Sequence, residues 1–422
     1  MPCRPTEDWT FGRGPTDTSR STTGQCAAIL PLPSTRGASV FDTPRWLSGP
    51  EKLVFDMGLY LRVSRALRRR YGLREGSGRL RRYLADERAI PHGGGNRYLR
   101  LRGRTFGIPA LPPLDSQAFV DHLLDDMRSL HGPELAPLSL AMLCITPRCP
   151  HRCPHCYNKQ DHGPEDLLST DLLVQAMRDL AREGVHNVFL SGGEPMLRRA
   201  DLPALIQAEP GLGVWVVSTG YGMEPGAMGA LATAGLRGVM ISIDGLDEAA
   251  HDAVKGREGA WGEACRAIAT CRSVGLVVGV NCMVGPALLE PGKLEEFTIH
   301  MGEIGAHFVS LNSPHPVAGD DSLEPLPVDE LMRIEERAAA TRRDPTWRHR
   351  PLAYSPDAWE ARRGCVGGQE FVYISPTGQV MSCPFLRDGI GDIRQRPLGE
   401  LMGEIRGQRA GCQVCRSLAA AT

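Results

Sequence analysis

The sequence predicts an α/β protein built around a parallel sheet. From residue 138 to about residue 312, short apolar runs alternate with segments whose apolar residues recur at helical spacing. The runs that read as buried strands are LSLAMLCIT, NVFLS, VWVVS, GVMISID, LVVGVNCMV and HFVSLN. Strands that alternate with helices favour a parallel sheet, wound either as an open sheet or as a partial barrel. In both arrangements ligands collect at the carboxyl ends of the strands.

Length and composition fit a globular protein with several segments. The 422 residues suffice for one large domain or two to three ordinary ones, and 48 glycines and 33 prolines indicate many loops. We expect five segments along the chain. They are a disordered segment 1–48, a basic α+β extension 49–137, the sheet-forming core 138–312, a linker with a helix 313–364, and a small C-terminal domain 365–422.

Charge and hydropathy exclude several classes of protein. The formal net charge of −1 gives no global argument for nucleic-acid binding, and no run of eighteen apolar residues is present to span a membrane. The N-terminus lacks the apolar stretch of a secretory signal, so we expect a cytoplasmic protein. In that reducing compartment, thirteen cysteines are not expected to form a disulfide framework.

The extension after residue 48 is strongly basic. Apolar residues from Leu53 to Leu67 fall at helical spacing, and between Arg62 and Arg104 there are fourteen arginines and three acidic residues. These arginines form either a solvated face or a surface for an anionic partner. A strand-like stretch RYLRLRGRTF and a helical run SQAFVDHLLDDMRSL follow.

Three cysteines follow the first strand of the core. Cys149, Cys153 and Cys156 have the spacing C-x3-C-x2-C, which wraps a short loop around a common centre. One interpretation is zinc, with His151 or His155 as a fourth ligand. The other is an iron–sulfur cluster that leaves one iron free to bind a second molecule.

The ends of the next strands carry small and polar residues. The second strand ends in FLSGGEP, where Gly192 and Gly193 let the backbone approach a neighbour closely and Glu194 follows. The third and fourth strands end in VVSTG and ISIDG. The serines in these stretches fit helix caps as well as a binding site.

Together these motifs resemble the radical S-adenosylmethionine (SAM) superfamily. The resemblance implies a partial (β/α)6 TIM-like barrel, with a SAM-binding [4Fe–4S] cluster on the three cysteines. It places Gly192, Gly193 and Glu194 at the methionyl amino group of SAM. Ser218, Thr219, Ser242 and Asp244 then lie beside its methionyl and ribose groups. Lys255 and Arg257, in HDAVKGREG, are both candidates for meeting the SAM carboxylate, and we include Arg257 in the predicted site.

The tail carries a second set of cysteines. It reads as a hairpin, EFVYISPTGQVMSC, and its four cysteines are Cys365, Cys383, Cys412 and Cys415. This pattern resembles the SPASM and twitch extensions of radical SAM enzymes, and fits the shorter twitch form. The resemblance implies an auxiliary [4Fe–4S] cluster whose irons all have protein ligands. A zinc knuckle is the alternative for the same residues.

The predicted function is a radical SAM oxidoreductase. The resemblance implies reductive cleavage of SAM to a 5′-deoxyadenosyl radical, removal of a substrate hydrogen, and oxidation of the substrate radical through the auxiliary cluster. We expect a peptide substrate, with a small metabolite or a lipid as alternatives, and flavodoxin or ferredoxin as electron donor. The basic residues 51–110 are expected to contact a leader peptide or an anionic membrane, or only to cap the barrel. The alternative from another class is a zinc-stabilised binding module without enzymatic activity.

Overall fold

The fold is organised by one large sheet. A computed structural model describes residues 44–85, 97–131, 137–317, 323–347 and 350–406. In these residues ten strands form a sheet in the order β10-β9-β8-β7-β6-β5-β4-β11-β12-β13, and three more form a small separate sheet, β1-β2-β3. The architecture is therefore α/β, as the sequence predicts.

The six predicted strands form the parallel centre of the large sheet. Each pairs in parallel with the next along the chain. Their carboxyl ends consequently share one edge of the sheet, which we call the upper rim. The strands are β4 (Leu140–Thr146), β5 (Asn187–Gly192), β6 (Gly213–Ser218), β7 (Gly238–Ser242), β8 (Val277–Met283) and β9 (Phe308–Asn312).

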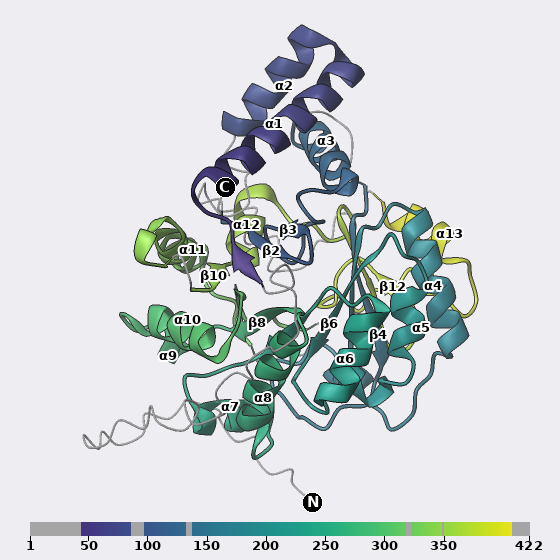
Figure 1. Cartoon of the computed structure of the whole chain (residues 1–422). Helices are drawn as coiled ribbons and strands as arrows, with labels where there is room; N and C mark the ends of the chain where they lie inside the picture. Colours follow the sequence, from purple (N-terminus) through teal and green to yellow (C-terminus); the bar gives the residue numbers. More distant parts are fainter. Residues whose placement is uncertain (1–43, 86–96, 132–136, 318–322, 348–349, 407–422) are drawn as a thin grey trace, which may run out of the picture.

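Helices connect these strands and cover one face of the sheet. Alternate residues of each strand, such as Val214 and Val216, pack on the helices, as expected from the two-residue period of a strand. The helices are α4 (Thr170–Arg182), α5 (Leu202–Gln207), α6 (Pro225–Ala234), α7 (Glu248–Lys255), α8 (Ala260–Ser273), α9 (Pro286–Leu289) and α10 (Lys293–Ile304), shown in Figure 1. Two short 3-10 helices, η1 (Lys159–Asp161) and η2 (Pro195–Arg198), lie in the connections near the rim.

The other face of the sheet packs against the N-terminal extension. Its side chains, including Trp215, Met240 and Phe308, form a cluster with Leu99 and Phe106. The last two belong to an antiparallel hairpin, which packs on this face of the sheet. The strands of the small sheet are β1 (Arg45–Trp46), β2 (Leu99–Leu101) and β3 (Arg104–Phe106).

Three helices of the extension lie beside this hairpin, and two of them contact its flanking residues Leu47 and Tyr98. The three helices pack on one another through a separate apolar cluster that includes Val63, Leu67, Val120 and Leu124. In Figure 1 two of them, α1 and α2, project from the end of the molecule opposite α7 and α8. The helices are α1 (Gly49–Tyr71), α2 (Leu73–Ala85) and α3 (Gln117–His131).

The tail continues the large sheet. The predicted hairpin is confirmed, since β11 and β12 pair in antiparallel fashion around the Pro-Thr-Gly turn. In addition, β11 pairs in parallel with β4, so the tail is hydrogen-bonded to the core sheet. The elements after β9 are α11 (Val328–Arg343), η3 (Pro345–Trp347), β10 (Leu352–Tyr354), α12 (Pro356–Arg363), β11 (Phe371–Ile374), β12 (Gln379–Met381), β13 (Gly391–Asp392) and α13 (Leu398–Ile405).

The sheet is curved enough for distant parts to meet. The ring of His315, which follows β9, lies 4.6 Å from the ring of Phe385, which follows β12. In the sheet order these strands are separated by β4–β8 and β11, so a flat sheet would keep the two rings far apart. The structure is therefore wound in the manner of a partial barrel.

Candidate functional site

The three predicted cysteines lie on the loop between β4 and η1. Each is half-buried. Burial raises the pKa of the Cys149 thiol to about 12 and that of Cys156 to about 11, and it also raises the pKa of Cys153. Desolvated thiols of this kind become thiolates when a cation or metal cluster supplies the compensating charge. The donor set therefore fits an iron–sulfur cluster held by these three residues.

Among the described residues, no three His, Cys, Asp or Glu side chains converge closely enough to hold one metal ion. Zinc and an iron–sulfur cluster both remain interpretations of the three cysteines at this point.

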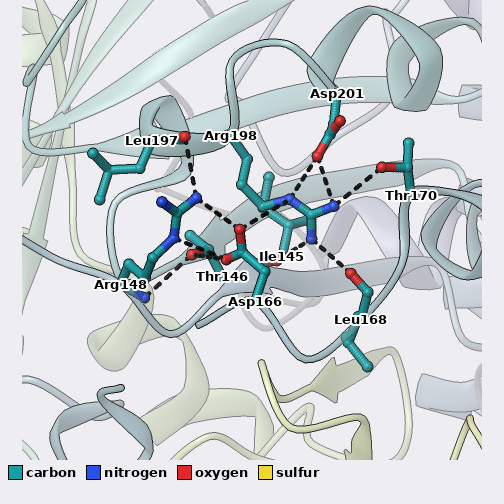
Figure 2. Close-up of polar contacts among 9 residues, drawn as sticks. All are labelled: Ile145, Thr146, Arg148, Asp166, Leu168, Thr170, Leu197, Arg198 and Asp201. Carbon is teal, nitrogen blue, oxygen red and sulfur yellow. Dashed lines mark hydrogen bonds and ion pairs between the residues drawn. The ribbon is translucent and has the colours of Figure 1, made fainter. Parts of the chain in front are cut away.

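Charged side chains anchor the start of the cysteine loop. Asp166 accepts hydrogen bonds from the Thr146 hydroxyl at 2.6 Å and from the Arg148 guanidinium at 2.7 Å. Arg198, which is 7% exposed, donates to the carbonyl oxygens of Ile145 and Leu168 at 2.8 and 2.9 Å (Figure 2). A buried guanidinium with several acceptors holds its neighbours in one arrangement, because each unmade bond would cost free energy. Neither Asp166 nor Arg198 belongs to a motif that could be recognised in the sequence.

The two glycines after β5 are required by packing against the cysteine loop. A Cβ atom on Gly193 would lie 2.1 Å from the Arg148 carbonyl oxygen and 3.0 Å from the Cys149 Cβ. Gly192 has a φ of +137°, and a Cβ atom on this residue would also lie too close to the Thr146 backbone. The backbone NH of Gly193 also donates to the Thr146 carbonyl at 2.7 Å. These glycines therefore place the loop directly against the tip of β5.

Glu194 joins the tips of β5 and β6. It is fully buried, and its carboxylate accepts hydrogen bonds from the Ser218 hydroxyl at 2.7 Å and from the Thr219 hydroxyl at 2.6 Å. The Thr219 and Met196 NH groups donate to the same carboxylate at 2.8 and 3.1 Å. Burial raises the pKa of Glu194, and these donors oppose that shift. The structure thus brings Glu194, Ser218 and Thr219 together, and their roles toward SAM stay predictions.

Asp244, which follows β7, lies in a buried ion pair. Its carboxylate is 2.7 Å from the Lys255 ammonium and 3.4 Å from His155 Nε2, and it accepts from the Met283 NH at 2.7 Å. Burial alone would raise the pKa of Asp244, but Lys255 and His155 hold it below its usual range. Lys255 also bonds to the cysteine loop, because its carbonyl accepts from the Arg152 NH at 3.0 Å.

The two cationic candidates for the SAM carboxylate differ in environment. Lys255 is 1% exposed and is paired with Asp244. Arg257 is half-buried, forms an ion pair with Glu263 at 2.5 Å, and lies 5.1 Å from the centre of the Tyr221 ring. Ser242 is half-buried at the end of β7. The roles of these residues toward SAM stay predictions.

The structure describes two of the four cysteines of the second set. Cys383 is buried, and half-buried Cys365 accepts a hydrogen bond from the Gly367 NH at 3.4 Å. Cys412 and Cys415 lie outside the described residues. The four-cysteine site consequently stays a prediction.

Aromatic and charged contacts join the tail to the cysteine loop. The ring of Tyr157, which directly follows Cys156, lies 6.0 Å from that of Tyr373 and 6.3 Å from that of Phe385. Arg387 donates to Asp161 at 2.9 Å. The segment around Cys383 therefore packs against the loop that carries the first three cysteines.

Two polar groupings near the rim were not predicted from the sequence. Asn158 donates to the Gly192 carbonyl at 2.9 Å and accepts from the Tyr373 hydroxyl, inside a buried network. His315 Nε2 lies 2.6 Å from an Asp357 carboxylate oxygen, and the second oxygen accepts from the Ser313 NH at 2.8 Å. Only the position of Asn158, two residues after Cys156, was a signal in the sequence. His315 and Asp357 are 42 residues apart and form no motif.

Parts of this chain are similar in sequence to known proteins. The radical SAM superfamily profile matches residues 143–290. The AdoMet-dependent heme synthase of Methanosarcina barkeri is 26% identical over 281 residues, which are 61% of this chain and 80% of the relative. The PqqA peptide cyclase of Rhizobium meliloti is 26% identical over 260 residues, which are 60% of this chain and 68% of the relative.

Solved structures show the same fold. Streptococcus suis SuiB bound to its precursor peptide SuiA has a TM-score of 0.54 and 16% identity, covering 71% of this chain and 74% of SuiB. The enzyme anSMEcpe with bound AdoMet has a TM-score of 0.50 and 13% identity, covering 63% of this chain and 82% of that one. The segment matched by the superfamily profile contains the cysteine loop and the polar tips of β5, β6 and β7. This chain is an enzyme with a radical SAM domain at residues 143–290.

Proposed function

We propose that the enzyme oxidises a peptide substrate and passes the second electron to an auxiliary iron–sulfur cluster in the tail. The observation that carries the proposal is the packing of the Cys383 segment on the cysteine loop. The two are joined by the Tyr157–Phe385 ring contact and the Arg387–Asp161 ion pair. An electron acceptor placed there lies close to the site where a substrate radical forms.

The residues of the first site have distinct roles in this proposal. Cys149, Cys153 and Cys156 would hold a [4Fe–4S] cluster, which, with SAM bound, would supply the radical chemistry that removes a hydrogen atom from carbon. Glu194 orients the tips of β5 and β6 through its hydrogen bonds with Ser218 and Thr219. The surrounding β-strands exclude water from the reacting groups. Flavodoxin or ferredoxin is the proposed source of the first electron.

A net two-electron oxidation also releases a proton. Once a hydrogen atom had left the substrate carbon, the carbon radical would have to lose one electron, which an auxiliary cluster would accept, and one proton, which requires a base. We propose His315 as that base. An Asp357 carboxylate oxygen lies 2.6 Å from Nε2, so in the neutral ring the proton would sit on Nε2 and the lone pair on Nδ1, the nitrogen that would accept the proton. His315 follows β9 on the upper rim and contacts Phe385, so it lies on the side of the sheet where the two cysteine regions meet.

A peptide is the favoured substrate because of the relatives. PqqA peptide cyclases are named for a peptide, and SuiB binds the precursor peptide SuiA. The likeness to the AdoMet-dependent heme synthases supports a second candidate, oxidation of a small molecule.

The test begins with anaerobically reconstituted protein. We expect about eight irons per chain, as two [4Fe–4S] clusters, and loss of about half of them when Cys149, Cys153 and Cys156 are all replaced by Ala. The reduced protein should form 5′-deoxyadenosine from SAM, and the Cys153→Ala variant should not. Stoichiometric zinc in a colourless protein, or S-adenosylhomocysteine as the product, would contradict the proposal.

The oxidative step has its own test. A peptide encoded beside the gene should lose two hydrogens, detected by mass spectrometry. The Cys383→Ala variant should still form 5′-deoxyadenosine while the oxidised peptide decreases. If both products fell together, the tail would have only a structural role. If the wild-type enzyme regenerated SAM in each turnover, the reaction would be a redox-neutral rearrangement.

A further inference from the structure

Exposed hydrophobic side chains are concentrated on the two projecting helices. Of the eight large hydrophobic residues that are exposed in the described part of the chain, seven lie on α1 and α2. Scattered exposed residues of this kind are normal, but a concentration on one element indicates a contact surface. The seven are Leu53, Val54, Met57, Tyr60, Leu61, Leu73 and Leu84.

Five of them form a continuous stripe on α1. Leu53, Met57, Tyr60 and Leu61 follow the spacing i, i+4, i+7 and i+8, which places them on one side of a helix, and Val54 borders them. Their exposed fractions range from 48% to 70%. The opposite side of α1 is already used, because its apolar residues pack in the clusters with α2 and α3. The helix therefore has a second apolar side that the described residues leave exposed.

The stripe runs into a basic region. Arg65 and Arg68 follow Leu61 at i+4 and i+7, so they continue the same side of α1 toward its C-terminal end. Both are exposed, as are Arg69, Arg70, Arg74, Arg81 and Arg82. Residues 49–85 carry ten basic and three acidic side chains, whereas the whole chain has a net charge of −1. An excess of seven positive charges thus lies beside the largest group of exposed hydrophobic residues in the described part of the chain.

We propose that this α1 surface, formed by Leu53, Val54, Met57, Tyr60, Leu61, Arg65 and Arg68, docks on an anionic lipid membrane. An apolar stripe with adjoining arginines is the pattern of helices that lie in the interface of a bilayer, where the hydrophobic residues enter the acyl boundary and the arginines meet phosphate groups. Among the described residues no helix is both long and apolar enough to cross a bilayer, which agrees with surface binding.

The shape of the surface favours lipid over a peptide partner. α1 is a helix of 23 residues, about 35 Å long, and it projects from the molecule together with α2 (Figure 1). Peptides usually bind in a groove or along the edge of a sheet, whereas a bilayer accepts a convex helical surface over its whole length. If α1 docks on the membrane, the upper rim and the cysteine loop stay on the body of the molecule, below α1.

The proposal is tested by co-sedimentation of the full-length reconstituted enzyme with vesicles. Binding is expected to phosphatidylcholine vesicles that contain phosphatidylglycerol, with little binding to pure phosphatidylcholine, and it should weaken as salt is raised. Replacing Leu53, Met57 and Leu61 together by Asp should abolish it. Replacing Arg68 by Gln should lower the partition coefficient about fivefold, since each arginine near an anionic surface contributes about 1 kcal/mol.

Matched controls come from elsewhere in the chain. Leu167 is the remaining exposed large hydrophobic residue in the described part of the chain, and Arg333 is an exposed arginine on α11. The Leu167→Asp and Arg333→Gln variants should bind vesicles as strongly as the wild-type protein does. The α1 variants should retain SAM cleavage without substrate, which shows that they fold.

Three results would overturn the proposal. One is absence of binding to the phosphatidylglycerol vesicles at low salt, and another is binding that the α1 variants do not change. The third is a wild-type dimer that the Leu53, Met57 and Leu61 substitutions convert to a monomer, since a second copy of the chain would then cover the stripe.

Discussion

Replacement of Lys255 by Met should destabilise the protein strongly, because it leaves the Asp244 carboxylate buried without its partner. The two side chains are 2% and 6% exposed and 2.7 Å apart. Removing one member of a buried ion pair typically costs about 3–5 kcal/mol, whereas replacing both by uncharged residues of similar volume is often neutral. We therefore expect Lys255→Met to lower the free energy of unfolding by about 3–5 kcal/mol. The double variant Lys255→Met, Asp244→Asn should recover most of that loss.

The pH dependence of the unfolding free energy tests the same ion pair independently. In the wild type the pKa of Asp244 is below its ordinary value of 3.8, so the pair contributes stability above that pH and loses it only as the pH falls further. In Lys255→Met, burial would instead raise the carboxyl pKa, so the charged form costs most at neutral pH. The difference in unfolding free energy between wild type and variant should shrink as the pH is lowered from about 7 to about 4. Urea titrations at several pH values measure it. A single variant as stable as the wild type at neutral pH, or a double variant no more stable than the single one, would refute this reasoning.

Further predictions concern the tip of β5 and the proton acceptor. Gly193→Ala should reduce iron retention and stability, because its Cβ would lie 2.1 Å from the Arg148 carbonyl oxygen. The control Gly229→Ala, which places its Cβ in open space on α6, should stabilise the protein by about 0.5–1 kcal/mol. Glu194→Gln should cost about 1–3 kcal/mol in urea unfolding, since an amide NH2 would replace one acceptor of the buried donors. His315→Ala should keep 5′-deoxyadenosine formation but lower the yield of oxidised peptide. An unchanged ratio of the two products would exclude His315 as the base.

Much of the fold could be predicted because its signals are local. Each of the six core strands is a buried apolar run, and most of the connecting helices show the helical period over two or more turns. The strand β10 was missed since its three residues, Leu352–Tyr354, show no periodicity and are set by pairing with β9. The helix α7 was missed because HDAVKG was interpreted only as a motif. The pairing of β11 with β4 could not be read from the hairpin itself, because it joins residues more than 200 positions apart.

The candidate site shows the same difference between local and long-range signals. The cysteine spacing and the Gly-Gly-Glu stretch are contiguous in sequence, so they could be recognised from the order of residues alone. The partners that hold them are not contiguous. Lys255 was one of two cationic candidates, and only the structure shows that it, rather than Arg257, lies buried on Asp244. His315 and Asp357 meet because β9 and β10 are neighbours in the sheet, a fact that depends on the missed strand.

The parallel pairing of β4 with β11 bears on how the two cysteine regions cooperate. The cysteine loop leaves the carboxyl end of β4, and Tyr373 of β11 reaches its residue Asn158 through a buried hydrogen bond. Asn158 in turn bonds to the Gly192 carbonyl at the tip of β5. A shift of β11 would therefore disturb both the loop and the Gly-Gly-Glu stretch, because buried polar groups lose free energy when their partners move away. In this arrangement the tail and the first site share one set of buried contacts. A substitution in the tail that breaks the Tyr373 hydrogen bond should therefore reduce SAM cleavage. Loss of Cys383 alone should not reduce it.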